Sequence, residues 1–186
     1  MKKKLQVFIS STFIDLKEER QAAVEAILNA GHIPAGMELF NADSASQLEV
    51  IKHWIDESDV YMLILGGRYG SIEQESGKSY THIEYDYAIE QGKPVFSVVI
   101  SKEALDKKIG ILKTDALETM HGEKYEGFKK LVTSKVCRFF DDVKDIKLSI
   151  HETLNKFREQ YELAGWVSGK EIQDTGTLVQ QIAQLQ

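Results

Sequence analysis

Short runs of β-branched and aromatic residues alternate along the chain with longer segments in which apolar positions recur every three or four residues. The short runs are typical of strands, and the longer segments are typical of amphipathic helices. This alternation predicts βαβ units, in which helices connect parallel strands. The predicted strands are 5–9, 32–35, 59–65, 95–100 and 136–140.

The predicted helices lie between and after these strands, at about 16–30, 48–55, 81–91, 125–133 and 143–163. Ser44 or Ser46 is a candidate cap for the second helix, after a loop at 36–44. The charged segment 101–122 shows no clear pattern and is left without an assignment. We interpret residues 1–166 as one α/β domain, and residues 167–186 as a C-terminal tail or terminal helix.

This order of elements predicts a flavodoxin-like, doubly wound sheet of five parallel strands flanked by helices, with strand order 2-1-3-4-5. The run 59–65 is apolar almost throughout, which is typical of a central strand. In such sheets, ligands bind beyond the carboxyl ends of the strands, where the strand order reverses. That point lies between the first and third strands, so the residues that follow them are the candidates for chemistry.

The first strand is followed by the polar segment Ser10-Ser11-Thr12-Phe13-Ile14-Asp15. Hydroxyls and backbone N–H groups ahead of a helix suit a phosphate or a ribose. Alternatively, Ser11 or Thr12 caps the helix and Asp15 interacts with its positive end. The sequence leaves both interpretations open. Glu19 and Arg20, one turn further on, are expected to support this loop.

The third strand is followed by a glycine-rich loop that begins with Gly66, Gly67, Arg68 and Tyr69. Two adjacent glycines let a ligand approach the backbone, and the Arg68 guanidinium offers paired donors for a phosphate. The loop has neither the P-loop motif nor a dinucleotide fingerprint. The alternative is a tight turn in which Arg68 forms a structural ion pair.

The helix after this loop begins near Ser79 and Tyr80 and carries Glu84. If the start of this helix faces the switch point, Glu84 projects into the cleft there. The alternative is a capping box, with Thr81 as the N-cap and Glu84 three residues later. His82 is expected at the surface or at the cap.

Composition narrows the possible functions. The net charge of −6 argues against binding to nucleic acids or anionic membranes, because both need a basic surface. The single cysteine, Cys137, excludes an internal disulfide framework and is expected to be a buried strand residue. No secretory signal is visible and no apolar run approaches the ~18 residues that span a bilayer, so we expect a cytoplasmic protein.

Metal and serine hydrolase chemistry find no support in the sequence. The five histidines show no metal-ligand spacing, and the Gly-x-Ser-x-Gly elbow of α/β hydrolases is absent. We therefore expect no metal site and no resident cofactor.

Three motifs together resemble a family catalogued as a domain of unknown function (the forty-sixty-two family). They are the segment 7–16 with Glu19-Arg20, the segment Gly67-Arg68-Tyr69-Gly70, and Ser79-Tyr80-Thr81 followed by Glu84 and Ala88. The resemblance covers about residues 5–99 and continues more weakly to 165–167. That family is similar to Toll/interleukin-receptor (TIR) domains and to nucleoside deoxyribosyltransferases, which implies a TIR-like fold.

The resemblance also implies an activity. Relatives in those superfamilies cleave N-glycosidic bonds of NAD or of nucleosides with a glutamate on the helix after the third strand, and Glu84 matches that position. The implied enzyme is an NAD glycohydrolase or cyclase in bacterial immune (antiviral defence) or stress signalling. NAD or a related nucleotide would be its substrate, and self-association or a partner protein is expected. The implied substrate-binding residues are Ser10, Ser11, Phe13, Asp15, Gly66, Gly67, Arg68, Tyr69, Ser79 and Tyr80.

A single carboxylate is sufficient for this chemistry, because nicotinamide leaves a cationic ring as a neutral molecule and needs no general acid. Two other functions stay open. One is a non-catalytic TIR-like scaffold or nucleotide-sensing module, and the other is a nucleoside deoxyribosyltransferase-like enzyme. The enzyme hypothesis expects Ser10, Ser11, Gly67, Arg68 and Glu84 to line one concave pocket.

Overall fold

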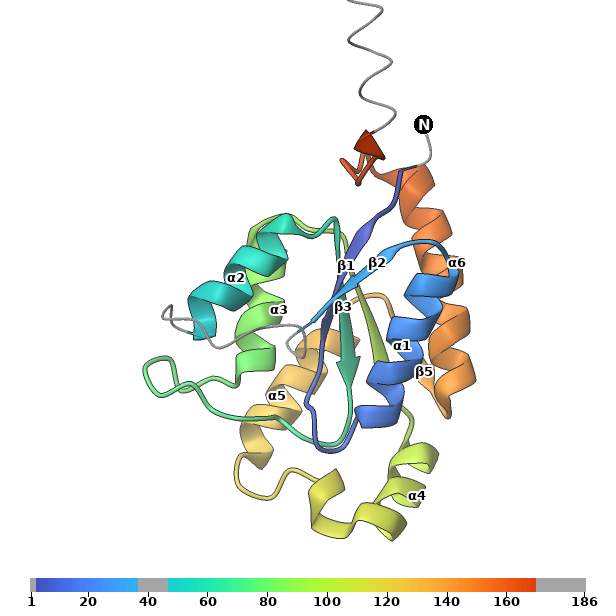
Figure 1. The fold of residues 1–186 in the computed structure, drawn as a ribbon. Helices are drawn as coiled ribbons and strands as arrows, with labels where there is room; N and C mark the ends of the chain where they lie inside the picture. The colour runs from blue at the N-terminus through green and yellow to red at the C-terminus, as the bar shows by residue number, and fades with distance from the viewer. Residues whose placement is uncertain (1–2, 37–46, 170–186) are drawn as a thin grey trace, which may run out of the picture.

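Five parallel strands form one sheet in the order β2-β1-β3-β4-β5, in a computed structural model that describes residues 3–36 and 47–169 (Figure 1). The strands are β1 (Gln6–Ser10), β2 (Ile33–Ala35), β3 (Val60–Leu65), β4 (Val95–Ile100) and β5 (Cys137–Phe140). The helices are α1 (Lys17–Asn29), α2 (Gln47–Glu57), α3 (Tyr80–Glu90), α4 (Lys102–Leu112), α5 (Gly122–Thr133) and α6 (Val143–Gln160). The predicted strand order and the flavodoxin-like fold class are confirmed.

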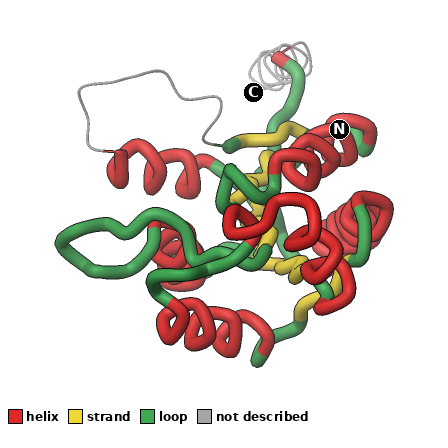
Figure 2. Tube along the Cα trace, turned by 90° about the horizontal axis from the view of Figure 1, so that it is seen from below, coloured by secondary structure: helices red, strands yellow, loops and turns green. Residues whose placement is uncertain are grey.

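Helices cover both faces of the sheet (Figures 1 and 2). One core lies between the sheet and helices α1 and α6, where Val7, Ile9 and Met62 meet Ile27 and Ile150. The other core lies between the sheet and helices α2, α3 and α5, and includes these buried residues: Phe8, Tyr61, Leu63, Ile51, Tyr85 and Phe128. Because both faces are covered, the central strands are apolar almost throughout.

The alternation of side chains along β1 places one polar residue toward α3. Phe8 packs in the core beside α3, and Ser10, two residues later, points to the same side. Ser10 is the last residue of β1 and is paired with Leu63 of β3. The carboxyl end of β1 therefore offers a hydroxyl to the helix that follows β3.

The segment 101–122, which the sequence left without an assignment, contains α4 and a 3₁₀ turn at Lys113–Ala116. Ser101 is the N-cap of α4, since its Oγ accepts the Ala104 N–H at 3.1 Å. Of the α4 residues only Ala104 is buried, but Leu105, Ile109 and Leu112 recur at helical spacing, a signal that the sequence analysis did not use. Cys137 was expected to be buried, but it is only half-buried on the edge strand β5.

Backbone hydrogen bonds join the two ends of the described chain. The Lys4 N–H donates to Trp166 O at 2.9 Å, and the Trp166 N–H donates to Lys4 O at 2.7 Å. Lys4 precedes β1, so this pairing lies at the edge of the sheet opposite the carboxyl ends of the strands (Figure 1). Three predictions lie outside the described residues: the loop at 36–44 beyond Gly36, the candidate caps Ser44 and Ser46, and the tail beyond residue 169.

A membrane crossing needs a helix that is both long and apolar, and within residues 3–36 and 47–169 none of the helices has that combination.

Candidate functional site

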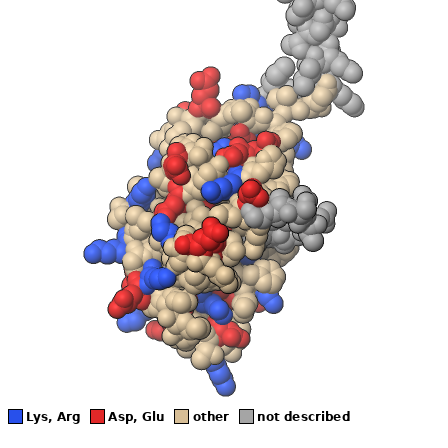
Figure 3. All heavy atoms as spheres, turned by 90° about the vertical axis from the view of Figure 1, so that its left-hand side faces the viewer, with Lys and Arg blue, Asp and Glu red and all other residues tan. Residues whose placement is uncertain are grey.

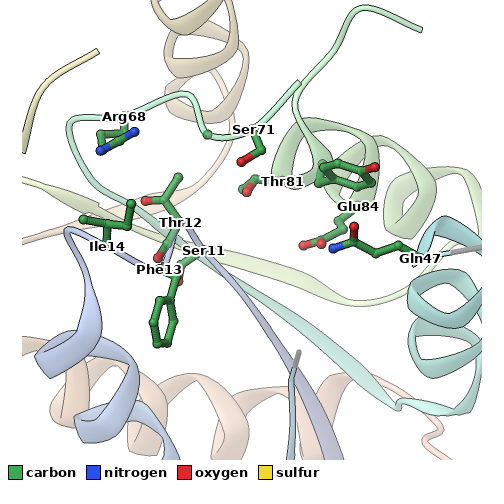
Figure 4. Close-up of a pocket in the computed structure, with 11 residues that line it drawn as sticks. Ser11, Thr12, Phe13, Ile14, Gln47, Arg68, Ser71, Thr81 and Glu84 are labelled. Atoms are coloured by element: carbon green, nitrogen blue, oxygen red, sulfur yellow. Dashed lines mark hydrogen bonds between the residues drawn. The ribbon is translucent and has the colours of Figure 1, made fainter. Parts of the chain in front are cut away.

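A cavity of about 250 Å³ lies at the carboxyl ends of β1 and β3 (Figure 4). Four segments line it: Ser11–Ile14 after β1, Arg68 with Gly70 and Ser71 after β3, Tyr80 with Thr81 and Glu84 on α3, and Gln47 on α2. Figure 4 shows Arg68 and Glu84 on different sides of this cavity, with Ser11 and Thr12 between them. The cavity is therefore at the switch point that the strand order predicts.

Glu84 lies at the inner wall of the cavity, with 3 % of its surface exposed. It belongs to the buried stripe of α3, which comprises Thr81, Glu84, Tyr85 and Ala88. This stripe has the helical spacing of a core-facing surface, and its first turns carry a hydroxyl and a carboxylate instead of apolar groups. The Ser10 hydroxyl donates a hydrogen bond to Glu84 Oε2, so the last residue of β1 fixes the carboxylate.

Burial raises the pKa of Glu84 to about 7, while the Ser10 hydrogen bond and the positive charge of Arg20 act in the opposite direction. Burial, and next the negative charge of Glu84, raise the pKa of the neighbouring Tyr61 well above its usual range. A carboxyl group with a pKa near 7 can hold or release a proton close to neutral pH.

The start of α3 differs from the capping box considered above. Ser79, not Thr81, is the N-cap, since its Oγ accepts the His82 N–H at 3.2 Å. The carboxylate of Glu84 contacts Ser10 and takes no part in capping. The capping-box interpretation is therefore wrong, because the helix begins one residue before Thr81 and its first turn is closed by another hydroxyl.

The β1–α1 loop does not cap α1 either. The N-cap of α1 is Leu16, with no side-chain hydrogen bond to the helix. Instead, Thr12 Oγ1 donates to Asp15 Oδ1 at 2.6 Å, and the Ser11 hydroxyl donates to the Thr12 carbonyl at 2.7 Å. Arg20 donates to Ser11 Oγ at 2.8 Å, so it supports the loop as expected. The alternative that Ser11 or Thr12 caps this helix is wrong.

Asp15 is buried below the loop and does not line the cavity. Burial raises the pKa of its carboxyl group, against the opposing effect of the Thr12 hydrogen bond. The Lys108 ammonium of α4 donates to the Asp15 carbonyl at 2.6 Å and forms an ion pair with Glu19 at 2.7 Å. Helix α4 therefore helps to hold the β1–α1 loop in place.

Gly66 and Gly67 pack against the protein rather than facing the cavity. A Cβ on Gly66 would lie 2.6 Å from Asp15 Oδ2, and a Cβ on Gly67 would lie 2.2 Å from the Ala116 carbonyl oxygen. The close approach that these glycines permit is thus made by neighbouring segments of the chain. The expectation that Gly67 lines the pocket is wrong.

Tyr69 turns into the core, where its hydroxyl hydrogen-bonds to His82 Nδ1 at 2.8 Å. His82 is half-buried and stacks on Phe128, with ring centroids 4.3 Å apart. His82 was expected at the surface or at the cap: its N–H does bond to the N-cap Ser79, but its ring packs in the aromatic cluster beneath α3 and not at the surface. Tyr69 therefore supports α3 from below and does not reach the cavity.

The predicted residues thus divide into two groups. Those that line the cavity are Ser11, Phe13, Arg68, Tyr80 and Glu84, with Ser10 behind Glu84. Those that pack elsewhere are Asp15, Gly66, Gly67, Tyr69 and Ser79.

Thr12 and Ile14 also line the cavity; they lie in the segment after β1 that was expected to bind a phosphate or ribose but were not among the predicted binding residues. The sequence did not place Gln47, Gly70, Ser71 or Thr81 in the cavity, which they also line. Thr81 could have been predicted, because it lies on the same face of α3 as Glu84 and is a polar residue in an otherwise core-facing stripe. Nothing in the local sequence signals Gln47, which reaches the cavity from α2.

Charge does not accumulate on the face shown in Figure 3, where acidic and basic side chains are interspersed. Within residues 3–36 and 47–169, the structure has no group of three or more His, Cys, Asp or Glu side chains that could hold a metal ion. Among the described residues that line the cavity, Arg68 is the cationic side chain and Glu84 is the acidic one.

Comparison with known proteins adds a family and a distant structural neighbour. The family model described as Domain of unknown function (DUF4062) matches residues 6–155. Among solved structures, a mutant form of a flavo di-iron protein from Thermotoga maritima is similar with a TM-score of 0.45 and 12 % sequence identity. That similarity covers 84 % of this chain and 36 % of the other, so the chain spans about a third of that protein. No relative among curated proteins matches the sequence.

Proposed function

The chain belongs to the family Domain of unknown function (DUF4062), and from this premise we propose that it cleaves N-glycosidic bonds of NAD or a related nucleotide. Glu84 is the proposed catalytic residue. We also propose that the family is distantly related to TIR domains and nucleoside deoxyribosyltransferases. The observation that supports the proposal most is a buried glutamate, with a pKa raised to about 7, at the wall of the switch-point cavity.

The chemistry follows from the charge of the substrate. When the bond between ribose C1′ and the nicotinamide nitrogen breaks, its electron pair goes to that nitrogen and neutralises the ring. Positive charge then develops on the ribose, where the Glu84 carboxylate stabilises it. Water adds to C1′ and gives its proton to Glu84, which releases it to solvent. The Ser10 hydroxyl holds the carboxylate in position throughout.

The rest of the cavity suits a nucleoside. The side chains of Ser11 and Thr12 lie between Arg68 and Glu84. Because their hydroxyl protons are donated within the loop, we propose that their oxygens accept hydrogen bonds from ribose hydroxyls. Phe13 and Tyr80 offer aromatic faces to a base. This division places the sugar beside the carboxylate and the base against the apolar part of the wall.

The decisive experiment is incubation of concentrated protein with NAD and with a panel of nucleosides, followed by chromatography of the products. The Glu84→Gln variant keeps the shape of the side chain and removes its negative charge. We expect nicotinamide release to fall about 10²-fold or more. Glu90→Gln, at an exposed position of the same helix, is the matched control and should keep full activity.

Equal rates for the wild type and Glu84→Gln would show that Glu84 is not the catalytic group. Release of a free base from nucleosides but not from NAD would favour a deoxyribosyltransferase-like enzyme. The absence of cleavage of every compound, even at high protein concentration, would contradict the enzyme proposal.

The low exposure of Glu84 favours one second candidate, a nucleotide-sensing module without catalysis. At 3 % exposure and with a pKa near 7, the carboxyl group is partly protonated at neutral pH and can donate a hydrogen bond to a ligand. A nucleotide that binds measurably and is recovered intact after long incubation would support this alternative.

A further inference from the structure

A second cavity, of about 450 Å³, adjoins the first on the other side of Arg68. Three residues line both cavities, namely Arg68, Gly70 and Ser71. The remaining wall of the second cavity comes from Ile72 and from the segment between α4 and α5, which includes Thr119 and His121. Arg68 therefore stands at the boundary between the two cavities.

Contacts on both sides of Arg68 hold it at this boundary. The Glu118 N–H donates to Gly67 O at 2.8 Å, and the Tyr69 N–H donates to Glu118 Oε2 at 2.9 Å. The Arg68 guanidinium donates to the Asp115 carbonyl at 3.3 Å. The residues before and after Arg68 are thus fastened to the segment that forms the second cavity, and its guanidinium is placed in advance of any ligand.

The guanidinium keeps most of its donors available. In the described part of the chain, the Asp115 carbonyl is its hydrogen-bond acceptor, and no carboxylate forms an ion pair with it. A planar guanidinium with several available N–H groups is the side chain best suited to bind the oxygens of a phosphate or diphosphate. Ser71 and Thr119 line the same cavity and add neutral hydroxyl groups to its wall.

Two acidic residues also line the second cavity, Asp115 and Glu118. Burial disfavours the ionised form of Glu118, but hydrogen bonds from three backbone N–H groups outweigh it and lower the pKa. Its charge is thus compensated by the backbone of the loop. An anion is therefore expected to bind on the Arg68 side of the second cavity and not at its acidic wall.

The volumes of the two cavities indicate that different parts of one ligand could occupy them. Ligand pockets for small molecules usually measure about 300–1,000 Å³, so the Glu84 cavity alone is small and the two together fall within that range. We propose that the two cavities form one bipartite site for a dinucleotide. The nucleoside that is cleaved occupies the Glu84 cavity, Arg68 binds the linking phosphates, and the second cavity takes the other nucleoside. The part of this inference that concerns cleavage rests on the proposed function.

The test measures binding and needs no catalysis. ADP and adenosine are titrated separately into the wild-type protein by calorimetry, at matched salt and pH. We expect ADP to bind about tenfold more tightly than adenosine, because only ADP offers phosphates to Arg68. The Arg68→Gln variant should lose this preference. Arg158→Gln, which removes the same charge from an exposed position on α6, should keep it.

The location is tested by NMR with the same two probes. ADP is expected to shift the backbone amide signals of Thr119 and His121, which line only the second cavity, more than that of Glu84. Equal affinity for ADP and adenosine in the wild type would overturn the inference without any variant. So would an ADP preference that survives in Arg68→Gln, or shifts confined to the Glu84 cavity.

These outcomes are distinct from those that test the enzyme. ADP binding at the second cavity without any nicotinamide release would support this subsite and contradict the proposed activity. Glu84-dependent nicotinamide release without a preference for ADP would do the reverse.

Discussion

The carboxyl ends of β1 and β5 lie at the same edge of the sheet, but their polar side chains serve different purposes. After β5, Asp142 is the N-cap of α6 and accepts the N–H groups of Lys144 at 2.7 Å and Asp145 at 3.3 Å. After β1, α1 begins without any side-chain cap. The hydroxyls there are bonded within the loop or, in the case of Ser10, to Glu84.

We call the carboxyl end of β5 the stabilising end and the carboxyl end of β1, which carries the proposed site, the functional end. A good N-cap typically contributes about 1 kcal/mol to stability. Buried carboxylates, in contrast, cost free energy unless they are fully paired. Asp15 Oδ2 and Glu19 Oε2 are buried without a hydrogen-bond partner among the described residues. The carboxylates around β1 therefore lower the stability of the fold, and they are held in a fixed arrangement next to the cavity.

The largest expected effect comes from removing the cation that compensates this region. In Lys108→Met, Glu19 loses its ion pair, in which the two side chains are only 17 % and 9 % exposed. Breaking a pair buried to this degree should lower the free energy of unfolding by about 3 kcal/mol. Urea unfolding measures this change. Lys107→Met, at an exposed position of the same helix, should change stability by less than ~0.5 kcal/mol. If Lys108→Met and Lys107→Met lowered the free energy of unfolding equally, the proposed difference between the β1 and β5 regions would be contradicted.

The pH dependence of catalysis tests the functional end directly. If ionised Glu84 is the active form, kcat/KM for NAD falls about tenfold per pH unit below the pKa of about 7. Because half of the carboxyl groups are already protonated at pH 7, the loss between pH 7 and pH 5 should be about 50-fold. Steady-state kinetics over this range, with protein stability checked at each pH, gives the profile. A profile that is flat across neutral pH would show that Glu84 does not act as a carboxylate.

The same carboxyl group should make stability depend on pH. Its pKa is raised in the folded state, so the wild type loses stability as pH rises from about the ordinary value of 4.5 to about 7. Glu84→Gln has no such loss. Its stability relative to the wild type should increase by about 2 kcal/mol between pH 5.5 and pH 8.5. Thermal unfolding at both pH values measures this, and a pH-independent difference would contradict the raised pKa.

The smallest effect is expected at the stabilising end. Asp142→Ala removes the cap of α6 and should cost about 1 kcal/mol of stability. Asp142→Asn keeps a good capping side chain and should stay close to the wild type. Neither variant should change nicotinamide release, because the cap lies outside both cavities. Loss of activity in a stable Asp142 variant would show that the carboxyl ends of β1 and β5 are coupled.

Much of this fold was predictable because apolar periodicity determines it. The strand order placed Ser11, Arg68 and Glu84 around one cavity before any side-chain contact was known. The residue that caps α3 was not predictable, because two hydroxyl side chains lie close together at the start of the helix. Ser79 and Thr81 lie two residues apart, and only the backbone geometry decides which of them caps α3.

The glycine-rich loop shows a second limit. Gly66 and Gly67 correctly indicated a close approach to the backbone, but sequence cannot tell a ligand from a neighbouring chain segment. Here the approach is made by Asp15 and Ala116, and Ala116 lies in the 3₁₀ turn after α4, within the segment that the sequence analysis left without an assignment. The contacts that fasten Arg68 and its neighbours to the segment between α4 and α5 could therefore not be predicted before the fold was known.

The pairing of Lys4 with Trp166 has a consequence for protein engineering. Because the backbones of Lys4 and Trp166 are already hydrogen-bonded to each other, a short peptide could connect these two positions, and new termini could be opened in an exposed turn such as 74–76. Such a circular permutant would keep the sheet order. A tether attached beside Lys4 or Trp166 would leave from the side of the sheet opposite the cavity, so immobilised protein would present its cavity to the solution.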